Sequence, residues 1–214
     1  MKKTTGFLKA LCAWMVILSP GLDAGHAPKK HAAGASCRPK ELTALTKSLV
    51  EKSLASFEKA NGKDLGTWSP GFPELQVHQN SPLVPSKVQC SFLFMVQGLG
   101  KVLKDQSSNL NPKDVSLHQV LKDTISHIKM LQMCVKHILG GECPSEPTPP
   151  KMPIDVFEKK QWSDTLLKAA RDYLNWLVHK FQEHSAKVNG TNNRKHKVIV
   201  TMHKKYLEGS GYLL

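Results

Sequence analysis

The sequence predicts an all-α protein, a long-chain four-helix bundle with up-up-down-down topology. Apolar residues recur at steps of three and four in four segments, 39–60, 88–104, 112–139 and 156–184. Long connections rich in proline follow the first and third segments, and a short one follows the second. A short connection makes its two helices antiparallel, whereas a long crossover lets them run parallel, so these lengths favour that topology.

The N-terminus has the features of a secretory signal peptide. Basic residues precede an apolar run from Phe7 to Leu18, and the small residues Ala24 and Ala27 suit cleavage. The run is shorter than the roughly 20 residues of a membrane span, which argues against the alternative of a single N-terminal anchor. We therefore expect residues 1–27 to be removed and the rest to be secreted and extracellular, without membrane insertion.

The remaining chain is strongly basic. Removal of Lys2, Lys3, Lys9 and Asp23 reduces the 30 basic and 17 acidic residues to 27 and 16, a net charge of +11. Such a charge favours acidic glycosaminoglycans or anionic cell surfaces as partners, and in an exported chain we do not expect nucleic acid as a partner. The length suits one domain, residues 28–186, with one core.

Four cysteines follow the signal peptide, Cys37, Cys90, Cys134 and Cys143. In an oxidising compartment they predict two disulfide bonds, and the spacing leaves all three pairings open. No Cys-x-x-Cys pair occurs, and no histidine stands at zinc-ligand spacing from a cysteine pair, so we expect no metal site. The sequence also lacks the motifs of a phosphate loop, a nucleophile elbow or a zinc protease. We expect neither an enzyme nor a cofactor.

The first two helical segments differ in how strongly their sequences favour a helix. The first begins with Pro39, which suits a first turn, and ends at Asn61-Gly62. Its expected core face is Leu42, Leu45, Leu49, Val50, Leu54 and Phe57. The connection 62–86 has too many prolines and glycines for regular structure over most of its length. The second segment, 88–104, has a broad apolar face that two glycines weaken.

The third segment has the clearest helical period of the chain. Asn111 is the expected N-cap, Pro112 fits the first turn, and Gly140-Gly141 stops the helix. Its expected core face is Leu117, Val120, Leu121, Thr124, Ile125, Ile128, Leu131, Val135, Ile138 and Leu139.

The fourth segment follows a second proline-rich connection. Asp155 stands where it can accept hydrogen bonds from the free amides of the first turn. The expected core face is Ser163, Leu166, Leu167, Ala170, Tyr173, Leu174, Leu177 and Phe181. Residues 187–214 are basic and lack an apolar stripe, so we expect a disordered tail. Asn189 is a glycosylation acceptor, and the cluster 194–197 either binds heparan sulphate or is simply a solvated basic stretch.

Phe157 does not fit the apolar face of its own helix. At 100° per residue it falls roughly 135° from the centre of the core face, so it should point to solvent. An aromatic side chain near a helix start, with Lys160 three residues on, has the composition of a binding hot spot. The alternative is that the preceding connection covers Phe157, and the periodicity does not separate these two possibilities.

At these residues the chain resembles the leukaemia inhibitory factor, ciliary neurotrophic factor and oncostatin M group of the interleukin-six cytokine family, most closely leukaemia inhibitory factor. The stretch 155–160, Asp-Val-Phe-Glu-Lys-Lys, is similar to the start of that family's fourth helix, and Phe157 and Lys160 match its Phe-x-x-Lys motif. The position of Trp162, five residues after Phe157, instead resembles the sequence of ciliary neurotrophic factor. A second match, Asp105-Gln106 followed by Leu110-Asn111-Pro112, resembles the connection into the third helix.

The resemblance implies a ligand that bridges two receptor chains. Phe157 and Lys160 would bind a leukaemia-inhibitory-factor-type receptor, and exposed faces of the first and third helices would bind the shared signalling glycoprotein of the family. The paired receptors would then activate Janus kinases and STAT signalling. We expect the ligand to be a monomer.

The resemblance also implies a disulfide between Cys37 and Cys134, which leaves Cys90 for Cys143. Two rival interpretations remain at this point: a different long-chain helical cytokine without the Phe-x-x-Lys anchor, and a cationic host-defence or heparin-binding protein that acts through residues 187–205.

Overall fold

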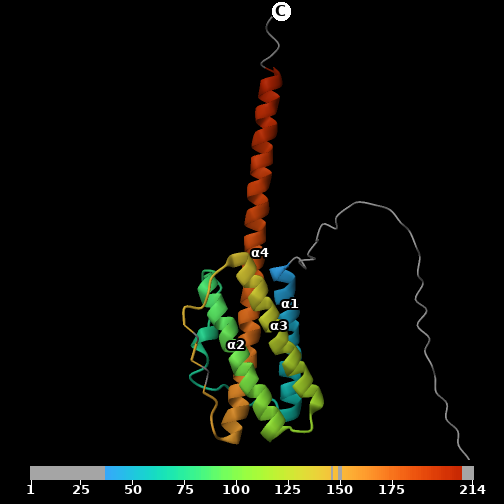
Figure 1. The fold of residues 1–214 in the computed structure, drawn as a ribbon, viewed down its shortest axis with the longest axis vertical. Coiled ribbons are helices and arrows are strands. Elements are labelled where there is room, and N and C mark those ends of the chain that lie inside the picture. Colours follow the sequence, from blue (N-terminus) through green and yellow to red (C-terminus); the bar gives the residue numbers. More distant parts are fainter. Residues whose placement is uncertain (1–36, 146, 149–150, 209–214) are drawn as a thin grey trace, which may run out of the picture. The chain divides into compact units, whose positions relative to one another are not determined.

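The computed structural model describes residues 37–145, 147–148 and 151–208, with side chains as far as residue 184. This part of the chain is all-helical and has no strand. Its helices are α1 (Pro39–Asn61), the 3₁₀-helix η1 (Pro73–Leu75), α2 (Pro85–Asp105), the π-helix η2 (Gln106–Leu110), α3 (Val115–Leu139) and α4 (Val156–Glu208). Figure 1 shows the four α-helices side by side, with the connection between α1 and α2 running along the outside. The predicted all-α class is therefore confirmed.

Two helices begin at residues other than those predicted. α2 already begins at Pro85, because proline lacks an amide hydrogen and suits the first turn. α3 begins later than predicted, at Val115, where the carboxylate of Asp114 accepts a hydrogen bond from the Leu117 amide (2.9 Å). Asn111 is therefore not the N-cap, and its side chain bonds to residues of α1 and η2 instead.

α4 continues far beyond residue 184, the predicted end of the fourth segment. The backbone remains helical to Glu208, so the expectation of a disordered tail does not hold for residues 187–208. The chain has no proline after Pro153, and extending an existing helix needs no new nucleus. The last residues of the predicted tail, 209–214, and the predicted signal peptide lie outside the described residues.

The predicted core face of α4 is buried along its whole length. Its residues Ser163, Leu166, Leu167, Ala170, Tyr173, Leu174, Leu177 and Phe181 are all buried. They pack against apolar residues of α1, α2 and α3 in one continuous core. Helical period alone was therefore sufficient to predict which side of α4 faces the bundle.

The core face of α1 is rotated from the predicted one. Leu45 is 51% exposed, while Thr46 and Ser53 are fully buried. Thr46 Oγ1 donates to the Leu42 carbonyl (2.7 Å), and Ser53 Oγ and Thr124 Oγ1 share a hydrogen bond across the helix pair (2.8 Å). Because these hydroxyls have partners, their burial costs little, and the apolar period of α1 did not reveal the inward face.

The long connection between α1 and α2 is part of the core despite its irregular backbone. It contributes three buried residues, Leu65, Phe72 and Leu75. The Phe72 ring lies 5.3 Å from the ring of Trp162 on α4 and 5.9 Å from that of Phe94 on α2, centroid to centroid. These edge-to-face contacts are the geometry that aromatic pairs prefer, so the loop is tied to both helices.

Two disulfide bonds join the helices at one end of the bundle. Cys37, just before α1, is bonded to Cys134 near the end of α3. Cys90 in α2 is bonded to Cys143, just beyond α3. The first bond is the one that the resemblance implied, and the second is the pairing that remained by exclusion. Each bond closes a long stretch of chain, 97 and 53 residues in sequence separation, and constrains the unfolded chain.

A glycine brings the second pair of cysteines together. Gly141 has a positive φ of 80°, and a Cβ there would lie 2.7 Å from Pro85 Cβ and 2.8 Å from its carbonyl carbon. Only a residue without a side chain allows the backbone after α3 to approach the start of α2 this closely. Cys143 follows two residues later and meets Cys90.

Hydrogen bonds join the helices at the opposite end. Asn61, the last residue of α1, donates from Nδ2 to Gln106 Oε1 (3.0 Å). Asn111 Nδ2 donates to the same oxygen (2.8 Å) and to Asn61 Oδ1 (3.0 Å). His118 Nε2 lies 3.0 Å from the Asn111 carbonyl oxygen. We call these four residues the polar cluster. It links the end of α1 and the first residue of η2 to the start of α3.

Candidate functional site

The first turn of α4 is built by its N-cap. Asp155 Oδ1 accepts hydrogen bonds from the amides of Phe157 (2.8 Å) and Glu158 (3.0 Å), as the sequence predicted. These two amides have no partner inside the helix, so the cap is what allows α4 to begin at Val156. It places Phe157 within the first turn.

Phe157 is exposed on this turn. Its side chain is 57% accessible, which excludes the alternative that the preceding connection covers it. Ile154 is 95% exposed and Val156 is 55% exposed, so three large apolar residues lie close together in sequence at the start of the helix. Exposed apolar residues that occur singly need no explanation, whereas contiguous patches of them are typical of binding surfaces, so this turn is a candidate for one. The sequence did not predict the two neighbours.

Lys160 lies on the same side of α4 as Phe157. Three residues at 100° each place the two side chains within about 60° of one another around the helix. Lys160 is half-buried, and it forms no ion pair with any side chain that the structure describes. Its ammonium group therefore remains available to a partner next to the aromatic ring.

The beginning of α4 is attached to the bundle through Lys159, on the side opposite Phe157, and further along through Gln161 and Thr165. Lys159 Nζ lies 3.2 Å from Asp105 Oδ1 at the end of α2. Gln161 Nε2 donates to the Leu65 carbonyl (3.0 Å), and one turn later the Thr165 hydroxyl accepts a bond from the Trp68 amide (2.9 Å). Trp162 is fully buried. Phe157 takes no part in these contacts and stays exposed.

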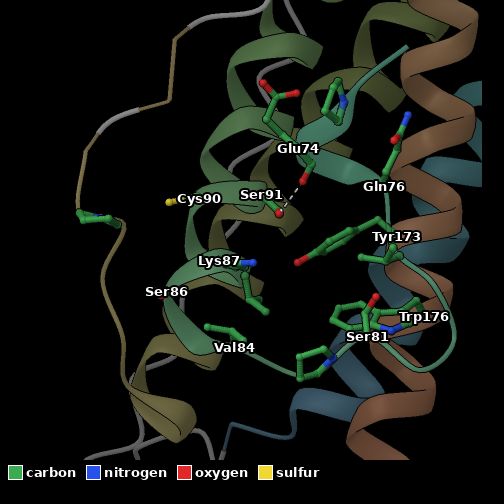
Figure 2. Close-up of a pocket in the computed structure, with 15 residues that line it drawn as sticks. Glu74, Gln76, Ser81, Val84, Ser86, Lys87, Cys90, Ser91, Tyr173 and Trp176 are labelled. Atoms are coloured by element: carbon green, nitrogen blue, oxygen red, sulfur yellow. Dashed lines mark hydrogen bonds between the residues drawn. The ribbon is translucent and has the colours of Figure 1, made fainter. Parts of the chain in front are cut away.

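A separate cavity lies between α2, α4 and the loop that connects α1 to α2. Its volume is about 590 Å³, and Figure 2 shows Tyr173 and Trp176 projecting into it from α4. Ser91 Oγ donates to the Glu74 carbonyl (2.8 Å) at its wall. Burial raises the pKa of Tyr173 to about 12, and a hydrogen bond with Ser91 opposes the shift. The phenol is therefore neutral at physiological pH and unsuited to general base chemistry.

The described side chains include no cluster of the kind that usually holds a metal ion. Within these residues, histidine, cysteine and acidic side chains do not gather in groups of three or more. In the same part of the chain, no helix has both the length and the apolar character that crossing a bilayer requires. Asn189 and the basic cluster 194–197 lie on the backbone of α4, but their side chains are outside the described ones.

Comparison of the chain with protein-family models gives no match, and no curated protein is significantly similar to it.

Proposed function

We propose that this chain is a secreted helical cytokine that acts by binding receptors and has no catalytic activity. Phe157 and Lys160 bind a leukaemia-inhibitory-factor-type receptor. The shared signalling glycoprotein of the interleukin-six family binds exposed faces of α1 and α3, and the assembled receptors activate Janus kinases. The observation that carries this proposal is the 57% exposure of Phe157 on a capped first turn, beside a lysine, Lys160, that has no ion-pair partner among the described side chains.

The proposed topology is up-up-down-down, in a long-chain bundle. Each disulfide joins the beginning of α1 or α2 to the region around the end of α3, which supports α1 and α2 both running antiparallel to α3. The Lys159–Asp105 ion pair joins the beginning of α4 to the end of α2, which supports α4 running antiparallel to α2. Receptor ligands of the cytokine type use this arrangement.

Secretion is supported by the same two bonds. Disulfides persist in oxidising compartments, and a domain of this size gains stability from them. Together with the signal-peptide features of residues 1–27, they favour an extracellular protein.

Phe157 suits a hot spot for physical reasons. A phenyl ring buries a large apolar area with few rotatable bonds, so little conformational entropy is lost on binding. Lys160 meets a carboxylate on the receptor or packs its methylene stem along the rim of the pocket. Ile154 and Val156 surround the anchor with apolar area that excludes water.

The second receptor face has its own exposed apolar residues. On α3, Met130 is 45% exposed and Met133 is 66% exposed, and on α1 Leu45 is 51% exposed. Methionine adapts its shape to a partner surface at low cost. Met130, Met133 and Leu45 lie toward the end of the bundle that holds the Cys37–Cys134 bond, whereas Phe157 is at the other end, so the two faces are separable by mutation.

The test is binding to immobilised ectodomains of both receptor chains. Phe157→Ala/Lys160→Ala should lose about 30-fold or more in affinity for the leukaemia-inhibitory-factor-type receptor, the usual effect of truncating an anchor. Met133→Ala is the control, because it also removes an exposed apolar side chain and should leave this affinity unchanged. Circular dichroism should first establish equal helicity of all variants. Equal affinity of the wild type and the double variant would refute the proposed site.

A further inference from the structure

The first turn of α4 depends on a buried carboxylate from another helix. Asp105 is the last residue of α2 and is only 5% exposed. Its Oδ1 accepts hydrogen bonds from Lys159 Nζ (3.2 Å) and Asn109 Nδ2 (2.7 Å). A buried carboxylate without a cationic partner is strongly unfavourable, so the ion pair is kept. Asp105 thereby holds the Lys159 side chain in place.

The π-helix η2 supplies the second hydrogen-bond partner of Asp105. Asn109 is in η2 and reaches back to Asp105, four residues earlier. In the same element Gln106 is fully buried and belongs to the polar cluster. The carboxylate is thus held by a residue of η2 as well as by one of α4. Single π-turns in helical proteins are frequently found next to functional sites.

Lys159 and Phe157 lie on opposite sides of the same helical turn. Two residues at 100° each separate them by about 200° around the axis of α4. A contact that holds Lys159 against the end of α2 therefore turns Phe157 outward. Gln161 and Thr165 attach α4 to the long loop further along, where their hydrogen bonds are made with Leu65 and Trp68 rather than with α2.

We propose that Asp105 is the positioning residue of the receptor-binding surface: through Lys159 it fixes the rotation of the first turn of α4, and so the direction in which Phe157 and Lys160 are presented. The receptor part of this inference rests on the proposed function. Asp105 itself is buried and does not contact the receptor. Replacing Asp105 would make Phe157 mobile. Part of the binding free energy would then be needed to order the turn.

The first experiment measures the turn directly, without a receptor. Amide hydrogen exchange at residues 159–161 should be about 10-fold faster in Asp105→Asn than in the wild type, because the turn opens locally. Exchange at Leu174, deep in α4, should not change. Asp172→Asn is the matched control, since it makes the same chemical change at an exposed carboxylate that pairs with Arg171. Equal exchange at residues 159–161 in wild type and Asp105→Asn would overturn the proposal.

A second pair of variants tests the same ion pair from its other side, in case Asp105→Asn fails to fold. Lys159 is partly exposed, so Lys159→Met keeps its stem and removes only the charge. It should accelerate exchange at the same amides. Lys159→Arg keeps the ion pair and should restore slow exchange, an outcome that a loss of general stability would not give. Fast exchange in both variants would contradict the role of the ion pair.

The second experiment is a double-mutant cycle in receptor binding. Asp105→Asn should lower the affinity about 5- to 10-fold, and adding it to Phe157→Ala should cost almost nothing more, because contacting or coupled residues are non-additive. Additive losses would refute the positioning role while leaving the proposed function intact. Absence of binding by the wild type would refute the proposed function, and with it the receptor part of this inference, whereas the exchange data would still decide whether Asp105 holds the turn.

Discussion

The two ends of the bundle are held by different chemistry. At one end, where α1 and α2 begin and α3 ends, two covalent bonds join the helices. At the other end, where α1 and α2 end and α4 begins, the polar cluster and the Asp105–Lys159 ion pair do so. Covalent bonds tolerate changes in their surroundings, whereas a network of hydrogen bonds depends on every member. The proposed receptor-binding surface lies at the second, more easily perturbed end.

The largest effect is expected from removing a disulfide bond at the end of the bundle that is held covalently. Cys37→Ser/Cys134→Ser should lower the free energy of unfolding by about 2–5 kcal/mol, because the unfolded chain regains the freedom that the bond removed. Chemical denaturation followed by circular dichroism measures this loss. Under conditions where the variant remains folded, its receptor affinity should equal that of the wild type. Reduced affinity of the folded variant would show that the two ends are not independent.

The end of the bundle that the polar cluster holds should be destabilised by a single substitution that changes no charge. Gln106→Leu leaves the side chains of Asn61 and Asn111 without their shared acceptor and should lower the free energy of unfolding by about 1–3 kcal/mol. Denaturation of Gln119→Leu is the control, because Gln119 is exposed and bonds only to Asp123 among the described residues. A loss no greater than that of the control would mean that the polar cluster does not hold this end together.

Titration of Tyr173 tests the part of the bundle between its middle and the end held by the disulfide bonds. Its pKa is raised to about 12 by burial, so the unfolded chain, with an ordinary pKa near 10, binds fewer protons above pH 10. Stability is therefore fully present below pH 10 and falls as the pH rises toward 12, by about 1 kcal/mol at pH 11. Absorbance titration of the tyrosinate should show a late step that Tyr173→Phe abolishes. Ionisation of all tyrosines near pH 10 in the folded protein would contradict the burial.

The smallest effect concerns Glu142, beside the second disulfide. A hydrogen bond and ion pair with Lys136 (2.6 Å) hold the pKa of Glu142 below its usual value. The small stabilisation is present above the usual pKa and is lost as the pH falls through the lowered one. NMR titration of the carboxyl should show its pKa rising in Lys136→Gln. It should also rise in Cys90→Ser/Cys143→Ser if the disulfide holds this segment. An unchanged pKa in the disulfide variant would mean that the segment keeps its place without the bond.

The sequence predicted those features that follow from local periodicity. The buried face of α4 and its cap at Asp155 are confirmed, because one apolar stripe and one capping residue determine them. The same period turned Phe157 away from the core but did not decide whether the preceding connection covers it, and its 57% exposure now does. By contrast, the exposure of Leu45 and the burial of Ser53 were missed, because Ser53 is buried through a hydroxyl partner on α3 that lies far away in sequence.

The supporting residues of the candidate site could not be predicted by similar means. Asp105 and Lys159 are separated by 54 residues, and nothing in either segment indicates that an aspartate at a helix end will be buried. The prediction of Asn111 as a cap was wrong because caps and inter-helix hydrogen bonds use the same side chain. The continuation of α4 to Glu208 was missed because an apolar stripe was taken as necessary for a helix.

The glycines of this chain differ in how the protein would respond to their substitution. Gly100 lies in α2, and a Cβ at this position would meet no atom within 4 Å, so Gly100→Ala should raise stability by about 1 kcal/mol through helix propensity. Gly141 has no such freedom, because any side chain there would collide with Pro85. In a library selected for folding stability, every substitution at Gly141 should be depleted, because a side chain there would keep Cys143 away from Cys90 and leave two free thiols in place of the bond.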